Sequence, residues 1–179
     1  MIPDAVRVAL RCLFVILLSL LLLPPSPCLA KGLGTQHLFK IERNTTANVV
    51  QYDAQLAPDG TLNAEKPIVA YWTMFAEDGR QEDLSLVETK LAYGFKTWSE
   101  AAGQGVLVQL VAYPERKLRV YQENGSYRAE ILIDGHLAFL DRIYVKSADG
   151  VILPKVEYLE LYGRDAGTGA SLYEKILIN

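Results

Sequence analysis

Apolar and polar residues alternate along several short segments of this chain, and this period of two restricts its possible folds more than any other feature. In residues 127–134, apolar side chains occupy every second position from Tyr127 to Ile133. Charged Arg128 and Glu130 occupy two of the three positions between them. Such alternation is typical of strands with one face buried. The same pattern predicts strands in residues 67–76, 137–146, 151–162 and 170–178.

The predicted strands are separated by turn sequences. Asn124-Gly125 and Asp134-Gly135 are typical of tight hairpin turns. We therefore expect a mainly β fold, a single-domain antiparallel β-barrel or β-sandwich of about eight to ten strands. A barrel is favoured because many short strands must protect their edges. In residues 137–146 the predicted apolar face comprises Leu137, Phe139, Ile143 and Val145, interrupted by Asp141.

One segment has a helical pattern instead. Ser85 and Glu88 have the spacing of a capping box, in which each side chain accepts a hydrogen bond from the other residue's backbone N–H. Leu84, Val87 and Leu91 would then share one stripe of the helix. Gly94 is expected to end it in a left-handed conformation. We predict one short helix over about residues 86–93.

The first 30 residues have the organisation of a cleaved secretory signal peptide. Arg7 and Arg11 precede the apolar run 12–23, which is shorter than the roughly 20 residues that span a bilayer. Small residues flank Leu29, so we place the cleavage between Ala30 and Lys31, and no stable membrane span is expected. Residues 31–179 then form the single β-rich domain.

Cleavage at this position would remove both cysteines, Cys12 and Cys28. The mature chain would have no disulfide, thiol nucleophile or cysteine metal site. Its net charge would change from −3 to −4, because Asp4, Arg7 and Arg11 leave. That charge disfavours nucleic acid as a partner. We expect an exported protein, periplasmic or extracellular; the alternative is a lipid anchor on Cys28.

Four sequence segments carry a family resemblance. They are "FKIERNTTANVVQYDA", the region with the Tyr71-Trp72 pair and the A-Y-G motif, "LDRIYVK", and "LPKVEYLELYG". In this order they resemble the exported bacterial family called domain of unknown function 4833 (DUF4833), over about residues 37–178. The resemblance implies one domain, export and a bacterial source. It transfers no catalytic residue, because no activity is established for the family.

Searches for catalytic and metal-binding patterns identify no strong site. His37 and His136 are the only histidines and are expected in exposed positions, so neither a metal site nor a cofactor is predicted. Glu157 and Glu160 should face opposite sides of one strand. Glu42 and Glu88 either converge as a carboxylate pair or form ion pairs, for example with Arg142 or Lys155.

The ten tyrosines and two tryptophans are the best indication of a binding site. Aromatic side chains with polar tips suit a cavity for a small apolar or sugar-like ligand, although they also suit a β-core. If a pocket exists, its predicted residues are Tyr71, Trp72, Tyr93 and Arg142.

Two functions follow from these patterns. The first is a non-catalytic module that binds a small ligand or interacts with another envelope component. The alternative is a hydrolase-like envelope enzyme with a site built from carboxylates and tyrosines. The absence of a catalytic motif favours the first, and the sequence leaves the oligomeric state open.

The position of cleavage is testable on protein recovered from the envelope of the expressing cell. We expect the intact mass under denaturing conditions to match a chain that begins at Lys31 and carries no adduct. A chain that begins at a diacylated Cys28 would contradict this expectation and identify a lipoprotein.

Overall fold

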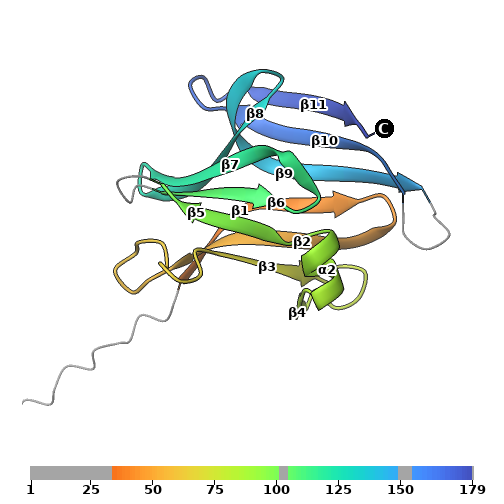
Figure 1. The fold of residues 1–179 in the computed structure, drawn as a ribbon, viewed down its shortest axis with the longest axis horizontal. Coiled ribbons are helices and arrows are strands. Elements are labelled where there is room, and N and C mark those ends of the chain that lie inside the picture. The colour runs from red at the N-terminus through yellow and green to blue at the C-terminus, as the bar shows by residue number, and fades with distance from the viewer. Residues whose placement is uncertain (1–33, 101–104, 149–154, 179) are drawn as a thin grey trace, which may run out of the picture. The chain divides into compact units, whose positions relative to one another are not determined.

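The computed structural model describes residues 34–100, 105–148 and 155–178, and Figure 1 shows their fold. The predicted signal peptide, Cys28 and the cleavage site between Ala30 and Lys31 lie outside the described residues. The first strands are β1 (Gly34–Arg43), β2 (Thr46–Leu56), β3 (Ile68–Thr73), β4 (Gln81–Asp83) and β5 (Phe95–Ser99). The others are β6 (Gly105–Leu110), β7 (Tyr113–Glu123), β8 (Ser126–Ile133), β9 (His136–Ala148), β10 (Lys155–Asp165) and β11 (Ser171–Leu177).

These eleven strands belong to one sheet, with the order β4-β3-β2-β1-β9-β8-β7-β6-β5 and with β10 between β9 and β11. Residues 136–139 of β9 pair with β8, residues 142–145 pair in parallel with β1, and β10 pairs with β9 from 138 to 148. Because a strand has only two edges, β8 and β1 must follow one another along the edge opposite β10. The other pairings among the described strands are antiparallel.

The sheet curls into a half-barrel, with the extra strands β10 and β11 beside β9 (Figure 1). Aromatic side chains connect strands that are far apart in the sheet order. Tyr52 of β2 stacks on Phe39 at 4.5 Å and meets Phe95 of β5 edge-on at 6.1 Å between ring centroids. In the described residues, β5 has no ladder with β3 or β4. Side-chain packing therefore brings the ends of the sheet together.

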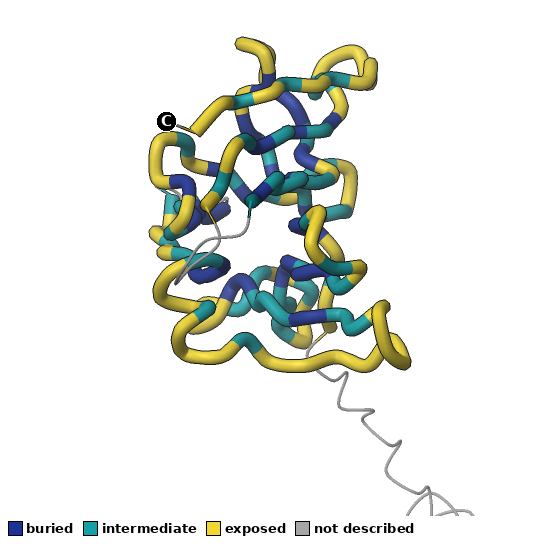
Figure 2. The backbone as a smooth tube through the Cα atoms, turned by 90° about the vertical axis from the view of Figure 1, so that its right-hand side faces the viewer, coloured by how far each residue is buried: buried dark blue, intermediate teal, exposed yellow. Residues whose placement is uncertain are grey.

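The alternation and the turns formed as predicted in β8. Tyr127, Ala129, Ile131 and Ile133 are all buried. The flanking hairpins place Asn124-Gly125 and Asp134-Gly135 at positive φ, from 49° to 80°, which is the conformation of the expected tight turns. Most of the buried residues lie within the strands, and Figure 2 shows that much of the outer backbone is exposed. The mainly β prediction is confirmed.

The prediction for β9 was wrong in its first half. Ala138 and Leu140 are buried, whereas Leu137 is 54% exposed. The ladder with β10 shifts between Leu140 and Arg142, so Asp141 is an extra residue in β9. A β-bulge of this kind reverses which alternate positions face the core, and Ile143 is therefore buried as predicted.

The helix α2 (Leu86–Leu91) begins at the predicted residue and ends before Tyr93. Its capping box is formed by Ser85 and Glu88, as predicted. The prediction that Gly94 takes a left-handed conformation was wrong, because its φ lies outside the positive region. Gly94 is required for a different reason: a Cβ there would lie 1.7 Å from the Thr89 carbonyl oxygen.

A second close approach occurs at Gly163, which lies buried opposite Leu140 beside the β9 bulge. A Cβ at this position would lie 2.4 Å from the Phe139 carbonyl oxygen and 2.8 Å from Ile133 Cδ1. We expect Gly163→Ala to lower the free energy of unfolding by about 1–3 kcal/mol, the usual cost of overpacking. Urea unfolding followed by circular dichroism would measure the loss.

The control for this substitution is Gly167→Ala, in the turn after β10. Its added Cβ would have ordinary contact, 3.5 Å from Asp165 Oδ1, at a φ that is not positive. We expect Gly167→Ala to change stability much less than Gly163→Ala. Equal effects of the two substitutions would contradict the close packing at Gly163.

Candidate functional site

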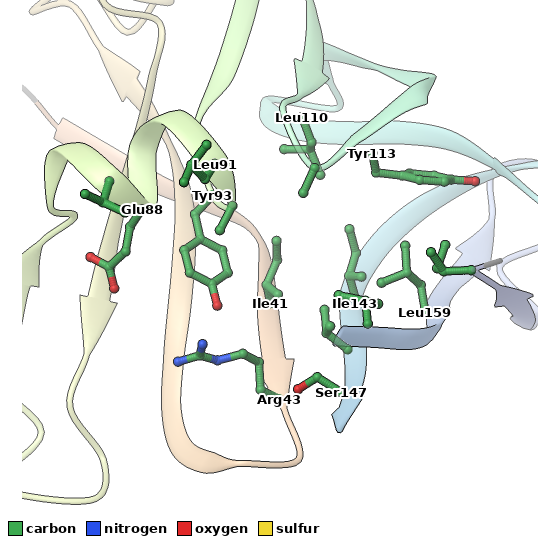
Figure 3. A pocket seen from close by; sticks show the side chains of 16 residues that line it. Ile41, Arg43, Glu88, Leu91, Tyr93, Leu110, Tyr113, Ile143, Ser147 and Leu159 are labelled. Atoms are coloured by element: carbon green, nitrogen blue, oxygen red, sulfur yellow. The ribbon is translucent and has the colours of Figure 1, made fainter. Parts of the chain in front are cut away.

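A pocket of about 380 Å³ lies between α2 and the curled sheet (Figure 3). Strands β1, β6, β9 and β10 contribute half of its lining residues, and α2 contributes three. The others come from the segment after α2, from the β6–β7 connection, from the start of β7 and from the residue after β11. Most of its lining side chains are apolar: Ile41, Val87, Leu91, Ala92, Leu110, Ala112, Ile143, Val145, Val156, Leu159 and Ile178. A cavity of this size and lining is within the range that holds small organic ligands.

Two β-bulges shape the sheet side of this pocket. Asp141 turns Ile143 toward the pocket, as described above. In β10 the ladder with β9 shifts between Val156 and Tyr158, so Glu157 is the extra residue. Without that shift, Val156 and Leu159 would face opposite sides of the strand. With it, both line the pocket.

The helix side of the pocket is incompletely covered. Val87 and Leu91 of α2 line the pocket, yet they are 63% and 60% exposed, and α2 has no buried residue. The predicted apolar stripe is therefore divided: Leu84 packs against the core, whereas Val87 and Leu91 border the pocket. Ile178 also lines the pocket and is exposed. The pocket thus opens to solvent through apolar side chains.

Most of the polar groups gather on one side of the pocket. In Figure 3, Arg43, Tyr93, Glu88 and Ser147 lie toward one end, whereas Leu110 and the ring of Tyr113 lie toward the other. The Arg43 guanidinium carbon lies 4.9 Å from the ring centroid of Trp72 and 5.5 Å from that of Tyr93. The two rings meet edge to face at 5.2 Å. Cation–π attraction to both rings holds the guanidinium in this position.

Glu88 is held by several donors. It accepts hydrogen bonds from the Ser85 backbone N–H and hydroxyl at 2.8 Å and from Trp72 Nε1 at 3.1 Å. Burial alone would raise the pKa of Glu88, but these hydrogen bonds and the positive charge of Arg43 outweigh it and lower the pKa below its ordinary value. Burial likewise raises the pKa of Tyr93, with Arg43 opposing the rise. Both groups therefore keep their usual charges at neutral pH.

The structure brings together two of the four residues predicted to bind a ligand. Tyr93 lines the pocket, and Trp72 lies directly behind Arg43 and Tyr93. Tyr71 does not join them: it contributes to a separate surface hollow and donates a 2.7 Å hydrogen bond to Asp53. Burial and this bond to Asp53 raise the pKa of Tyr71 to about 12.

Arg142 also lies away from the pocket. It donates a 2.8 Å hydrogen bond to Glu42, and its guanidinium carbon is 3.9 Å from the ring centroid of Tyr162. Of the two predicted alternatives for Glu42, the ion pair with Arg142 is therefore the one that forms. Glu42 does not converge with Glu88 as a carboxylate pair. Tyr162 and Tyr173 both donate to Glu160, which occupies that carboxylate as well.

Sequence reasoning missed Arg43 and did not place Glu88 beside the aromatic pair. One signal was present: Phe39, Ile41 and Arg43 occupy alternate positions in β1. A cation that continues an apolar strand face is unusual, because burying a charge is costly unless a partner compensates. That pattern identifies Arg43 as a candidate binding residue.

No metal centre was found in the described residues, which contain no group of three or more His, Cys, Asp and Glu side chains placed to hold an ion. His37 Nδ1 lies 2.9 Å from Asp53 Oδ1, and His136 Nδ1 lies 3.9 Å from Asp165. The two histidines thus have separate carboxylate neighbours. Within the described segments, no helix has the length and apolar character needed to span a bilayer.

Comparison with known proteins identifies one family. Residues 39–175 match the family model described as "Domain of unknown function (DUF4833)". No curated protein and no solved structure matches the chain.

The lowered pKa of Glu88 makes its stabilising effect dependent on pH. Because the folded carboxyl has a pKa below the ordinary 4.5, its charge stabilises the fold above that pH, and this stabilisation is lost as pH falls through the folded pKa. We expect Glu88→Gln to lower the free energy of unfolding at pH 7 by less than about 1 kcal/mol, since the group is only half-buried and solvent screens its charge. The difference between the urea midpoints of the variant and the wild type should be smaller at pH 3 than at pH 7.

The exposed Glu157 provides the control substitution, Glu157→Gln. It should leave the urea midpoint close to that of the wild type at both pH values. A loss for Glu88→Gln that is the same at pH 7 and pH 3 would show that the carboxylate charge of Glu88 is not what stabilises the helix start.

Proposed function

We propose that this chain, which belongs to the DUF4833 family, is an exported, non-catalytic protein that binds a small, mainly apolar molecule in the pocket between α2 and the sheet. The family description assigns no activity, so the pocket supports the proposal. Its single strongest support is an apolar cavity of about 380 Å³ that opens to solvent.

An occupied pocket would resolve an unfavourable feature of the fold. Apolar surface left in contact with water costs about 25 cal/mol per Å² relative to burial. Val87 and Leu91 expose such surface at the pocket rim, and Leu86 adds to it on the same helix. A ligand that covered the rim and filled the cavity would gain binding free energy from this surface.

The chemistry of the pocket favours binding over catalysis. Glu88 is the one carboxylate among its described lining residues, whereas glycosidase-like hydrolysis needs two. Hydrogen bonds from Ser85 and Trp72 already occupy the Glu88 oxygens, and its lowered pKa makes it a poor proton donor or acceptor at neutral pH. We therefore prefer the binding function to the hydrolase-like alternative.

Export is consistent with this role. The proposed signal peptide directs the chain out of the cytoplasm, and cleavage after Ala30 leaves a domain without cysteine. An apolar small molecule in an aqueous compartment needs a protein surface that excludes water. The pocket would supply that surface.

Binding can be tested with the uncharged fluorescent probe N-phenyl-1-naphthylamine. We expect its fluorescence to rise to saturation at one probe per chain. Leu159→Phe would fill the pocket from inside and Ala112→Trp would obstruct its rim, since both residues line it. Each substitution should weaken probe binding by about tenfold or more, equal to about 1.4 kcal/mol.

The control is Leu132→Trp, at a position on β8 that is already exposed and does not line the pocket. It should leave probe affinity unchanged. Urea unfolding would verify that every variant is folded. Absence of saturable binding, or binding that neither pocket substitution weakens, would contradict the proposed function.

A further inference from the structure

We propose that the ligand is a single-chain amphiphilic anion whose acidic head group is held by Arg43 and whose hydrocarbon chain lies along the sheet wall of the pocket. This inference rests on the proposed binding function and adds the chemical class of the ligand. It depends on the polar groups at one end of the pocket and on their hydrogen bonds.

Arg43 has an unsatisfied hydrogen-bond donor. Its Nε is buried and has no hydrogen-bond partner among the described residues. A buried donor without an acceptor costs roughly 1–3 kcal/mol, more when it is charged. An acidic group of a ligand would accept from this donor and offset the cost.

Six other arginines lie in the described part of the chain, and carboxylates pair with five of them: Arg80, Arg116, Arg119, Arg142 and Arg164. The sixth, Arg128, lies over the Phe139 ring at 5.9 Å and does not line the pocket. No ion pair of Arg43 is found in the described part of the chain. Instead, the rings of Trp72 and Tyr93 hold its guanidinium beside the pocket. A planar guanidinium fixed in this way is suited to a carboxylate or phosphate oxygen.

Glu88 is the nearby group that would compete for Arg43, yet the two form no ion pair. Its carboxylate already accepts from Ser85 and Trp72, so these donors hold it in the helix cap. The unsatisfied group is thus a donor, and the acceptor beside it is satisfied. This imbalance favours an anionic head group over a cationic one.

Ser147 provides a second polar contact on the same side of the pocket. Its backbone N–H donates to Asn44 Oδ1 at 2.8 Å, but its hydroxyl is 3.5 Å from that oxygen, the limit of a hydrogen bond. The hydroxyl makes only a weak hydrogen bond within the protein, so donating to a ligand instead would cost little free energy. Figure 3 shows Ser147 and Arg43 near one another and Leu110 away from them.

The rest of the pocket fits a hydrocarbon chain. From the polar end, the wall continues through Ile143 and Leu159 toward Leu110, with Leu91 opposite on α2. These residues offer no charged group to a ligand. A molecule with an acid at one end and an alkyl chain at the other matches both parts of the pocket.

The test compares ligands with the same chain and different head groups, decanoate and decan-1-ol, by competition against the bound naphthylamine probe. We expect decanoate to bind the wild type at least about tenfold more tightly than decan-1-ol, because a charge-assisted hydrogen bond is the stronger one. Arg43→Gln should remove this preference and leave decan-1-ol affinity unchanged.

Two further variants make the result specific. Arg164→Gln removes one positive charge from an exposed ion pair with Asp141 and should keep the preference for decanoate. Arg43→Lys keeps the positive charge and should retain part of the preference for decanoate. Because the wild-type comparison requires no substitution, the inference is tested even if Arg43→Gln does not fold.

The outcomes separate the two proposals. Equal affinity of the wild type for decanoate and decan-1-ol, with both displacing the probe, would overturn the anionic head group and leave the binding function intact. A preference for decanoate that persists in folded Arg43→Gln would overturn the role of Arg43. Failure of the probe and both ligands to bind would contradict the binding function itself.

Discussion

The two backbone edges of β9 determine how the rest of the sheet is arranged. One edge pairs with β10, and the other pairs first with β8 and then with β1. The parallel pairing places Arg43 opposite Val145 and Ile41 opposite Ile143, which assembles the pocket wall from strands about 100 positions apart in sequence. The bulge at Asp141 completes this arrangement, because it turns Ile143 to the pocket while Arg142 faces Glu42 outside.

Local sequence patterns predicted the parts of this fold that depend on local chemistry. Asn-Gly and Asp-Gly turns, the alternation in β8 and the capping box of α2 all have causes within a few residues. Predictions failed at bulges, as in the first half of β9, where one extra residue reverses the faces. A bulge follows from pairing with distant strands. The charged Asp141 interrupts the predicted apolar face, but that interruption alone does not identify a bulge. The parallel contact of β1 with β9 was equally inaccessible, since it depends on the topology of the whole chain.

The candidate site was partly accessible from the same patterns. Alternation in β3 already separates Tyr71 from Trp72, because neighbouring residues of a strand face opposite sides; the structure places Trp72 beside Tyr93 and Tyr71 beside Asp53. Arg43 follows the buried face of β1 and was identifiable by that position. The proximity of Arg43 to Glu88 was not predictable, since these residues meet only through the packing of α2 against the curled sheet.

The pocket has two walls that differ in their attachment to the core. The sheet wall includes buried residues such as Ile143 and Leu110, so displacing it would disrupt the core. The α2 wall has no buried residue, so side-chain packing constrains it less than the sheet wall. If the pocket binds a ligand as proposed, the sheet wall would keep its shape and the helix would adjust to the ligand. Discrimination among molecules of different shape would come from the sheet wall, and tolerance of different thickness would come from the helix.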